Sequence, residues 1–163
     1  MDLTSKVWWG YLEQDLQELM LQGFDLLRVS SSLSHYHDYS FIVFPVSKAY
    51  EGFLKKFFFD MKFITQEDYD GTRFRIGKAL NPSLEKGERN DQWVYGKLEK
   101  YCNGEDLPNL LWDTWKNCRN QVFHWFPRHA RALTLSEAEA CLNQVVLAID
   151  SVFHECKVPW KKE

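Results

Sequence analysis

Apolar residues recur at steps of three and four positions along most of this 163-residue chain. That spacing places them on one face of an α-helix, whereas a half-buried strand would alternate apolar and polar residues. No segment of the sequence alternates convincingly. The sequence therefore predicts an all-α fold, a helical bundle of about five to six helices joined by short links, in a single domain over 1–163.

The first two expected helices form the N-terminal half of the bundle. One covers residues 4–28, and Thr4 or Ser5 could cap it by accepting hydrogen bonds from the free amides of its first turn. The other covers about 38–61, and the carboxylate of Asp38 could cap it in the same way.

Further helices are predicted at 76–80, 92–101, 106–126 and 134–155. Proline and glycine mark several boundaries: Pro45 should bend or delay the second helix, Gly104 should follow a helix end, and Pro127 should stop the helix before it. Thr134 and Glu137 have the spacing of a capping box at the start of the last helix.

Charge and cysteine usage exclude several classes of protein. The chain has 20 Lys and Arg against 23 Asp and Glu, a net charge of −3, so any site for a polyanion must be local. Four cysteines occur without a CxxC pair, which predicts free thiols and a cytoplasmic protein. No apolar stretch approaches 18 residues, so we expect no membrane span.

The main candidate site lies near the end of the expected 106–126 helix, where Arg119 and Asn120 precede His124. Histidine can take and give protons near neutral pH, and a guanidinium matches phosphate oxygens. Five steps along a straight helix would separate Arg119 and His124 by about 140° and about 7.5 Å. Pro127 cannot donate to the carbonyl of Phe123, so a loosened last turn would let His124 swing towards Arg119.

Three stretches give the chain a resemblance to a known family. They are the Arg119-Asn120-x-x-x-His124 run, the earlier acidic helix with Asp38 and Lys48-Ala49-Tyr50-Glu51-Gly52-Phe53-Leu54, and Arg75-Ile76-Gly77-Lys78-Ala79-Leu80-Asn81-Pro82. On these residues the chain resembles the HEPN superfamily, most closely the HEPN domain of the RNase LS (RnlA-like) toxins. The likeness covers about 38–155.

The resemblance implies a small α-bundle that pairs through its motif helices and cuts RNA without a metal or other cofactor. His124 would be the acid and base, Arg119 the phosphate clamp and Asn120 a polar support. Glu51 and Asp38, thirteen residues apart, would complete the site. RNA would be the substrate, and the protein a homodimeric toxin of a toxin–antitoxin or phage-defence system with a cognate antitoxin. The related toxins carry further N-terminal domains, for which this chain has no room.

These residue types suit metal-free cleavage of RNA. The reaction deprotonates a 2′-hydroxyl, which attacks the adjacent phosphorus, and protonates the 5′-oxygen that leaves; histidine can do both proton transfers. A fixed guanidinium stabilises the charge that develops on the phosphate oxygens. We therefore predict an endoribonuclease that leaves 2′,3′-cyclic phosphate ends.

Plainer interpretations remain for each candidate. His124 could pack at a helix end, Arg119 could only bridge to a carboxylate, Asp38 could be a helix cap alone, and Glu51 could be a surface charge beside Lys55. The alternative function is a non-catalytic HEPN domain that binds nucleotide or RNA, or serves as a protein-interaction scaffold.

Two other clusters of residues are candidate sites. Arg128, His129 and Arg131 follow the motif and would form a positive entrance for RNA, or else a solvated link. His35, His37 and Asp38 could bind zinc, but no downstream ligand set completes the coordination, so we predict no metal site.

Overall fold

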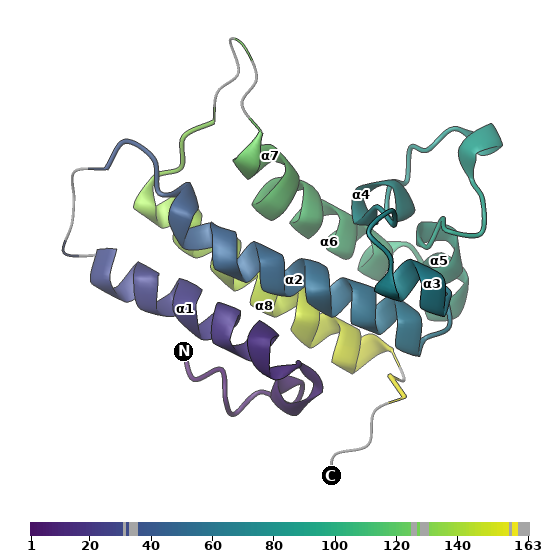
Figure 1. Ribbon diagram of the computed structural model, residues 1–163, viewed down its shortest axis with the longest axis horizontal. Helices are drawn as coiled ribbons and strands as arrows, with labels where there is room; N and C mark the ends of the chain where they lie inside the picture. The colour runs from purple at the N-terminus through teal and green to yellow at the C-terminus, as the bar shows by residue number, and fades with distance from the viewer. Residues whose placement is uncertain (31, 33–35, 125–126, 128–130, 157, 160–163) are drawn as a thin grey trace.

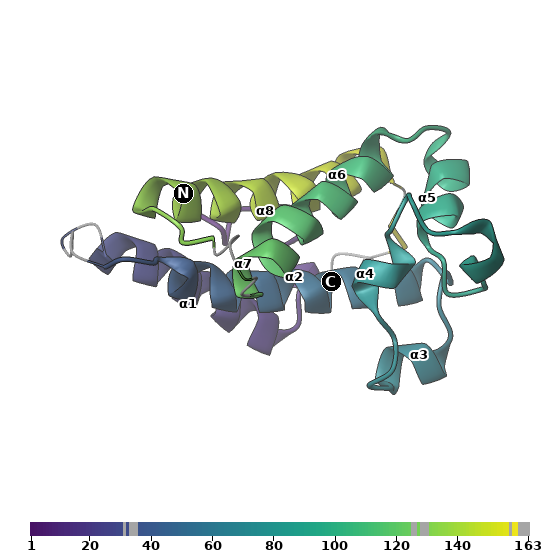
Figure 2. The same ribbon diagram turned by 90° about the horizontal axis from the view of Figure 1, so that it is seen from above.

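The computed structural model describes residues 1–30, 32, 36–124, 127, 131–156 and 158–159. These residues form helices and connecting loops without any strand, which confirms the all-α prediction. Three long helices carry the architecture: α1 (Gln14–Ser30), α2 (Ser40–Asp60) and α8 (Leu135–Glu155). Two layers result, with α1 beside α2 in one layer and α8 beside α6 (Asp106–Trp115) in the other (Figures 1 and 2).

Shorter elements complete the described chain. The α-helices among them are α3 (Gln66–Asp70), α4 (Ile76–Ala79), α5 (Tyr95–Cys102) and α7 (Gln121–Phe123). Two 3₁₀ helices, η1 (Trp9–Tyr11) and η2 (Lys86–Glu88), and a π-helical segment, η3 (Lys116–Asn120), make up the rest. Figure 1 shows α3, α4 and α5 together at one end of the molecule, beyond the long helices.

The core lies between the two layers and is rich in aromatic side chains from α2. Tyr50, Phe53, Phe57 and Phe58 have no solvent-exposed surface, and the rings of Phe53 and Phe57 stack 6.0 Å apart. Phe59 is only partly buried and stacks on Tyr69 instead, at 4.8 Å. The run of three phenylalanines therefore belongs mainly to the core.

The predicted helix over 4–28 is wrong in its first ten residues, because α1 begins at Gln14. The Asp2 carboxylate accepts the amide and the hydroxyl of Thr4, and the Ser5 hydroxyl donates to the Asp2 carbonyl, so neither Thr4 nor Ser5 caps a helix. Such local bonds compete with helix formation. The path of the chain before α1 depends on a buried tryptophan.

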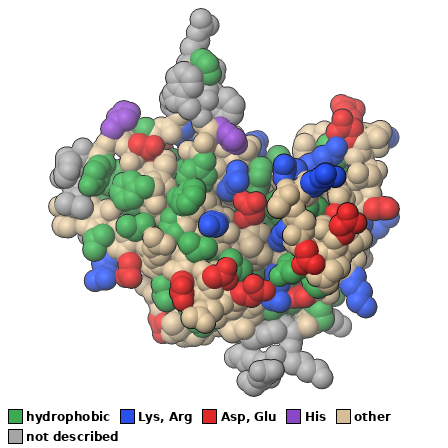
Figure 3. Space-filling model, viewed as in Figure 1, with side chains coloured by type: hydrophobic (Ala, Val, Ile, Leu, Met, Phe, Trp, Pro, Cys, Tyr) green, Lys and Arg blue, Asp and Glu red, His purple; other side chains and the backbone are tan. Residues whose placement is uncertain are grey.

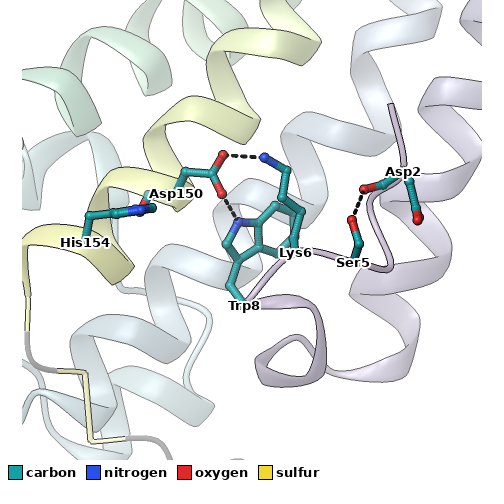
Figure 4. Close-up of polar contacts among 6 residues, drawn as sticks. All are labelled: Asp2, Ser5, Lys6, Trp8, Asp150 and His154. Atoms are coloured by element: carbon teal, nitrogen blue, oxygen red, sulfur yellow. Dashed lines mark hydrogen bonds and ion pairs between the residues drawn. The ribbon is translucent and has the colours of Figure 1, made fainter.

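That tryptophan, Trp8, is fully buried and donates its indole N–H to the Asp150 carboxylate on α8, at 2.6 Å. Lys6 donates to the other carboxylate oxygen at 2.7 Å (Figure 4). We call residues 1–12 the N-terminal strap. It runs across the bundle to α8 because burying a tryptophan there outweighs extending α1.

Most of the boundaries predicted for the other helices are confirmed. The capping box of Thr134 and Glu137 is present, and α5 ends at Asn103 in the left-handed conformation, with φ 53°. The second helix begins two residues later than expected and continues through Pro45. A second capping box, formed by Thr65 and Asp68, starts the short α3, which the sequence analysis did not predict.

The four cysteines are free thiols, as expected. Within the part of the chain that the structure describes, no helix combines the length and the apolar character needed to cross a bilayer.

Candidate functional site

The helix that carries the candidate motif is interrupted where the motif begins. After α6, the chain forms the π-helical segment η3, in which the amide of Gln121 donates to the carbonyl of Lys116, five residues earlier. A π-turn takes one more residue per turn than an α-helix. The rotation between Arg119 and His124 therefore departs from that of the uninterrupted helix predicted over 106–126.

His124 itself leaves the helix. It follows the last residue of α7 with an extended backbone (φ −106°, ψ 128°), and its side chain is exposed. This agrees with the expectation that the last turn loosens before Pro127.

Arg119, Asn120 and His124 line one cavity together with Glu51 from α2. We call this space, of about 480 Å³, the motif cavity; Trp112 and Trp115 of α6 and the loop and helix over 74–78 form its remaining walls. The structure thus brings four of the five predicted catalytic residues to one place, although the motif and Glu51 are separated by 68 residues at the Arg119 contact.

An ion pair fixes the arginine within this cavity. Arg119 donates through Nε to Oε2 of Glu51 at 3.2 Å, and the guanidinium lies 5.8 Å from the ring of Trp115. The two charged side chains are 33% and 43% exposed, so neither is shut off from solvent. The Nη nitrogens of Arg119 donate to no described residue, which leaves this edge of the guanidinium open to an anion.

The fifth predicted catalytic residue, Asp38, lies outside the motif cavity. It lines a second space of about 350 Å³, the Asp38 cavity, together with His124 and Arg131. One oxygen of Asp38 accepts the amide and hydroxyl of Ser40, at 2.9 and 2.6 Å, and the amide of Leu133 at 3.0 Å. Asp38 therefore ties the start of α2 to the chain before α8, but it is not the predicted N-cap, because that position is held by Tyr39 without a side-chain cap bond. The Asp38 cavity shares only His124 with the motif cavity.

These hydrogen bonds also set the ionisation of Asp38. Partial burial raises its pKa, but the bonds from Ser40 and Leu133 favour the charged form and lower the pKa below its ordinary value overall. Asp38 is thus a carboxylate across the neutral range.

Of the three residues predicted to bind RNA, only Arg131 lies among the described residues. It is exposed and donates to the side chain of Gln121 at 3.3 Å. Arg128 and His129 lie outside the described residues, as does His35 of the metal interpretation. Among the described residues, no group of three or more His, Cys, Asp and Glu side chains is placed to hold a metal ion.

A third and larger space adjoins the motif cavity and shares Arg119 and Glu51 with it. This α1–α2 cavity, of about 730 Å³, lies between the two helices and also contains Lys48, Phe44 and Phe123. The α1–α2 and Asp38 cavities share Phe123, so each of the three cavities adjoins the other two. Figure 3 shows this face, with apolar side chains gathered over α1 and α2 and basic side chains near α4.

The two tryptophans of the motif cavity are site residues that were not predicted from the sequence. Trp112 and Trp115 stack with their ring centres 5.9 Å apart, and Gly77 of α4 lies against Trp115. A Cβ atom at Gly77 would come within 2.3 Å of the indole, so only glycine allows this approach. Gly77, which lies in the family-like stretch from Arg75 to Pro82, is the one sequence signal of this contact.

Comparison of the chain with models of protein families, with curated proteins and with solved structures found no match.

Proposed function

We propose that this protein is a metal-independent endoribonuclease and that the motif cavity is its active site. The observation that carries the proposal is that Arg119, Asn120, His124 and Glu51 line a single open cavity, with the arginine held by the carboxylate. A proton-transferring imidazole and an oriented guanidinium are the groups that cleavage of RNA by its own 2′-hydroxyl requires.

In the proposed reaction, an imidazole of His124 removes the proton of the 2′-hydroxyl. The 2′-oxygen then attacks the adjacent phosphorus, and the bond from phosphorus to the 5′-oxygen breaks. An imidazolium of His124 protonates that leaving oxygen. The products are a 2′,3′-cyclic phosphate and a 5′-hydroxyl end.

Arg119 supports the reaction by binding the phosphate oxygens as they gain charge. Glu51 is a positioning residue, because its ion pair to Nε holds the guanidinium at the cavity wall and leaves the two Nη nitrogens to bind the phosphate. Asn120 supplies a further polar group to the same wall.

We further propose that two copies pair so that their motif cavities form one cleft, and that the enzyme acts as a growth-arresting toxin held in check by an antitoxin. The resemblance of the motif to HEPN nucleases supports this part of the proposal. Phe44, which is exposed beside the motif and contacts the partly buried ring of Phe123 edge to face at 5.5 Å, supports pairing on this face.

The decisive assay compares wild type and His124→Ala on mixed RNAs in EDTA. Loss of general acid–base catalysis predicts a fall in cleavage rate of at least about 10²-fold. His154→Ala is the matched control, because His154 lies on α8, bonded to the carbonyl of Asp150, and lines none of the three cavities (Figure 4). Equal cleavage by wild type and His124→Ala would remove His124 from the mechanism.

The second candidate function is a non-catalytic scaffold, favoured by the fact that Arg119 already has a protein partner in Glu51. Expression separates the two functions. A toxic nuclease is poorly tolerated until His124 is replaced, whereas a scaffold shows no difference between wild type and His124→Ala.

A further inference from the structure

We infer that the motif cavity contains a subsite for one unpaired nucleotide of single-stranded RNA, next to the phosphate that is cut. The base stacks on the tryptophan wall of Trp112 and Trp115, and the backbone binds Arg75 and Lys78. The inference rests on the proposed function and adds to it the part of the substrate that the cavity selects.

The aromatic wall is the first support. Trp112 and Trp115 lie nearly parallel, at 16°, and both line the cavity. Aromatic faces bind any nucleobase by stacking, once the base is free of its own helix.

The charge of the walls is the second support. Arg75, Lys78 and Arg119 line the cavity against one carboxylate, Glu51, although the whole chain is negative. Basic side chains lie on this face near α4 (Figure 3). The cavity is thus a local site for an anion on a protein that would otherwise repel one.

Two of these cations are available to a ligand. Arg75 donates to the carbonyl of Thr72, and no described carboxylate pairs with it. Lys78 pairs with Glu88 at 3.3 Å, but both side chains are at least half exposed, at 50% and 59%. Such a pair contributes little free energy, so a phosphate can replace Glu88 as the partner of Lys78.

Because the cavities are connected, we infer that the ligand of the motif cavity is a polymer and not a free nucleotide. The motif cavity, at about 480 Å³, is within the range of about 300–1,000 Å³ typical of small-ligand sites. It shares Arg119 with the α1–α2 cavity and His124 with the Asp38 cavity. The α1–α2 and Asp38 cavities also share Phe123, so a strand that leaves the motif cavity past His124 or past Arg119 continues along one connected surface.

The test measures binding separately from cleavage. His124→Ala protein is titrated into a fluorescently labelled, mixed-sequence single-stranded RNA, and anisotropy gives Kd at several salt concentrations. In this background, adding Arg75→Ala and Lys78→Ala should reduce the slope of log K against log salt by about 1.4, since each phosphate contact to a single strand contributes about 0.7. Arg28→Ala with Lys100→Ala removes two cations that line none of the three cavities and should leave the slope unchanged.

The stacking contact has its own variants. Trp112→Ala should weaken binding by roughly 5- to 150-fold, the range for removing one base–aromatic stack. Trp112→Phe keeps an aromatic face and fills most of the space, so it should retain most of the affinity. Thermal melting of each variant shows that the fold is intact.

Two further ligands test whether the subsite selects an unpaired strand and whether it requires a polymer. A duplex of the same sequence should bind at least about tenfold more weakly, because a stacked and paired base cannot reach the tryptophans. A nucleoside monophosphate that binds as tightly as the oligonucleotide would overturn the inference that the ligand is a polymer. Unchanged Kd and salt slope in the cavity variants would overturn the inference that the subsite exists.

The proposed nuclease and the subsite fail in different ways. RNA binding that depends on Trp112, Arg75 and Lys78 supports the subsite even if wild type cuts no RNA. Cleavage that depends on His124 but is indifferent to all three substitutions overturns the subsite and leaves the nuclease standing.

Discussion

One carboxylate on α2 sets the position of the arginine in the motif. Glu51 holds Arg119 by its Nε at 3.2 Å, in a pair that is only partly exposed. Surface pairs of this kind contribute about 0–1 kcal/mol to stability. The role of Glu51 in the proposed site therefore lies mainly in where it points the guanidinium.

Glu51→Gln is expected to lower the rate of RNA cleavage much more than it lowers stability, because the amide no longer fixes the arginine by charge. Cleavage kinetics and urea unfolding measure the two effects on the same protein. Asp25→Asn serves as control: it breaks the exposed pair with Arg28, whose side chains are 69% and 76% exposed. Equal losses of activity in the two variants would contradict a positioning role for Glu51.

Asp38 allows a prediction about stability and pH. Its pKa is lower in the folded protein, so its contribution is fully present above the unfolded value of about 3.9 and is lost as pH falls through the folded value. Asp38→Ala should destabilise the fold by about 1–3 kcal/mol at pH 7, because it leaves the amides of Ser40 and Leu133 without their acceptor.

Urea unfolding of wild type and Asp38→Ala at pH 7 and pH 3 tests this. The difference between the two proteins should narrow at the lower pH. A difference that is constant with pH would mean that ionised Asp38 does not stabilise the fold. Cleavage in Asp38→Asn, which keeps an acceptor oxygen, shows whether Asp38 acts only as an anchor.

At the scale of elements, the close packing of α1 on α2 depends on one small residue. A Cβ atom at Gly23 of α1 would lie 2.2 Å from Cγ2 of Val46 and 3.3 Å from the carbonyl of Ile42, both on α2. Gly23→Ala must push the two helices apart or force Val46 from its rotamer.

We expect Gly23→Ala to destabilise the protein by about 1–3 kcal/mol, as overpacked sites do. Gly87→Ala is the matched control, because nothing lies within 4 Å of its added Cβ atom. Urea unfolding should show no comparable loss for Gly87→Ala. If Gly23→Ala is as stable as wild type, the helices do not pack as closely as the structure has them.

Elements also show why the sequence predicted part of the fold. Long helices such as α8 repeat their apolar positions often enough to be recognised, and Thr134 marks the start of α8. The five-residue α3 is too short to show a period. The strap around Trp8 fits a helical pattern, but its contact with Asp150, 142 residues away, overrides that pattern.

The site was predictable to a similar extent. Arg119, Asn120 and His124 stand close together in the sequence, so their chemistry and spacing could be recognised. The π-helical segment η3 could not be expected, because a search for periods of 3.6 assumes an uninterrupted helix. The role of Trp112 in the cavity wall could not be predicted, because a tryptophan on a helix face usually packs in the core.

For the whole molecule, the proposed shared cleft requires a dimer. Light scattering at micromolar concentration should give about twice the chain mass of 19.4 kDa. Phe44→Asp, on the exposed apolar face beside the α1–α2 cavity, should shift the mass towards the single chain and reduce cleavage. Leu147→Asp is the control, because Leu147 is equally exposed, at 55%, and lines none of the three cavities. A wild-type particle of one chain would count against the shared cleft.

The contact of the N-terminal strap with α8 has a consequence for biosynthesis. Lys6 and Asp150 are 144 residues apart, and Trp8 reaches its buried position only against that same aspartate. The beginning of the chain leaves the ribosome long before its docking surface has been translated. During this interval an apolar tryptophan is without cover, so a nascent-chain pulse-labelling experiment should find the first residues protease-sensitive until Asp150 has emerged.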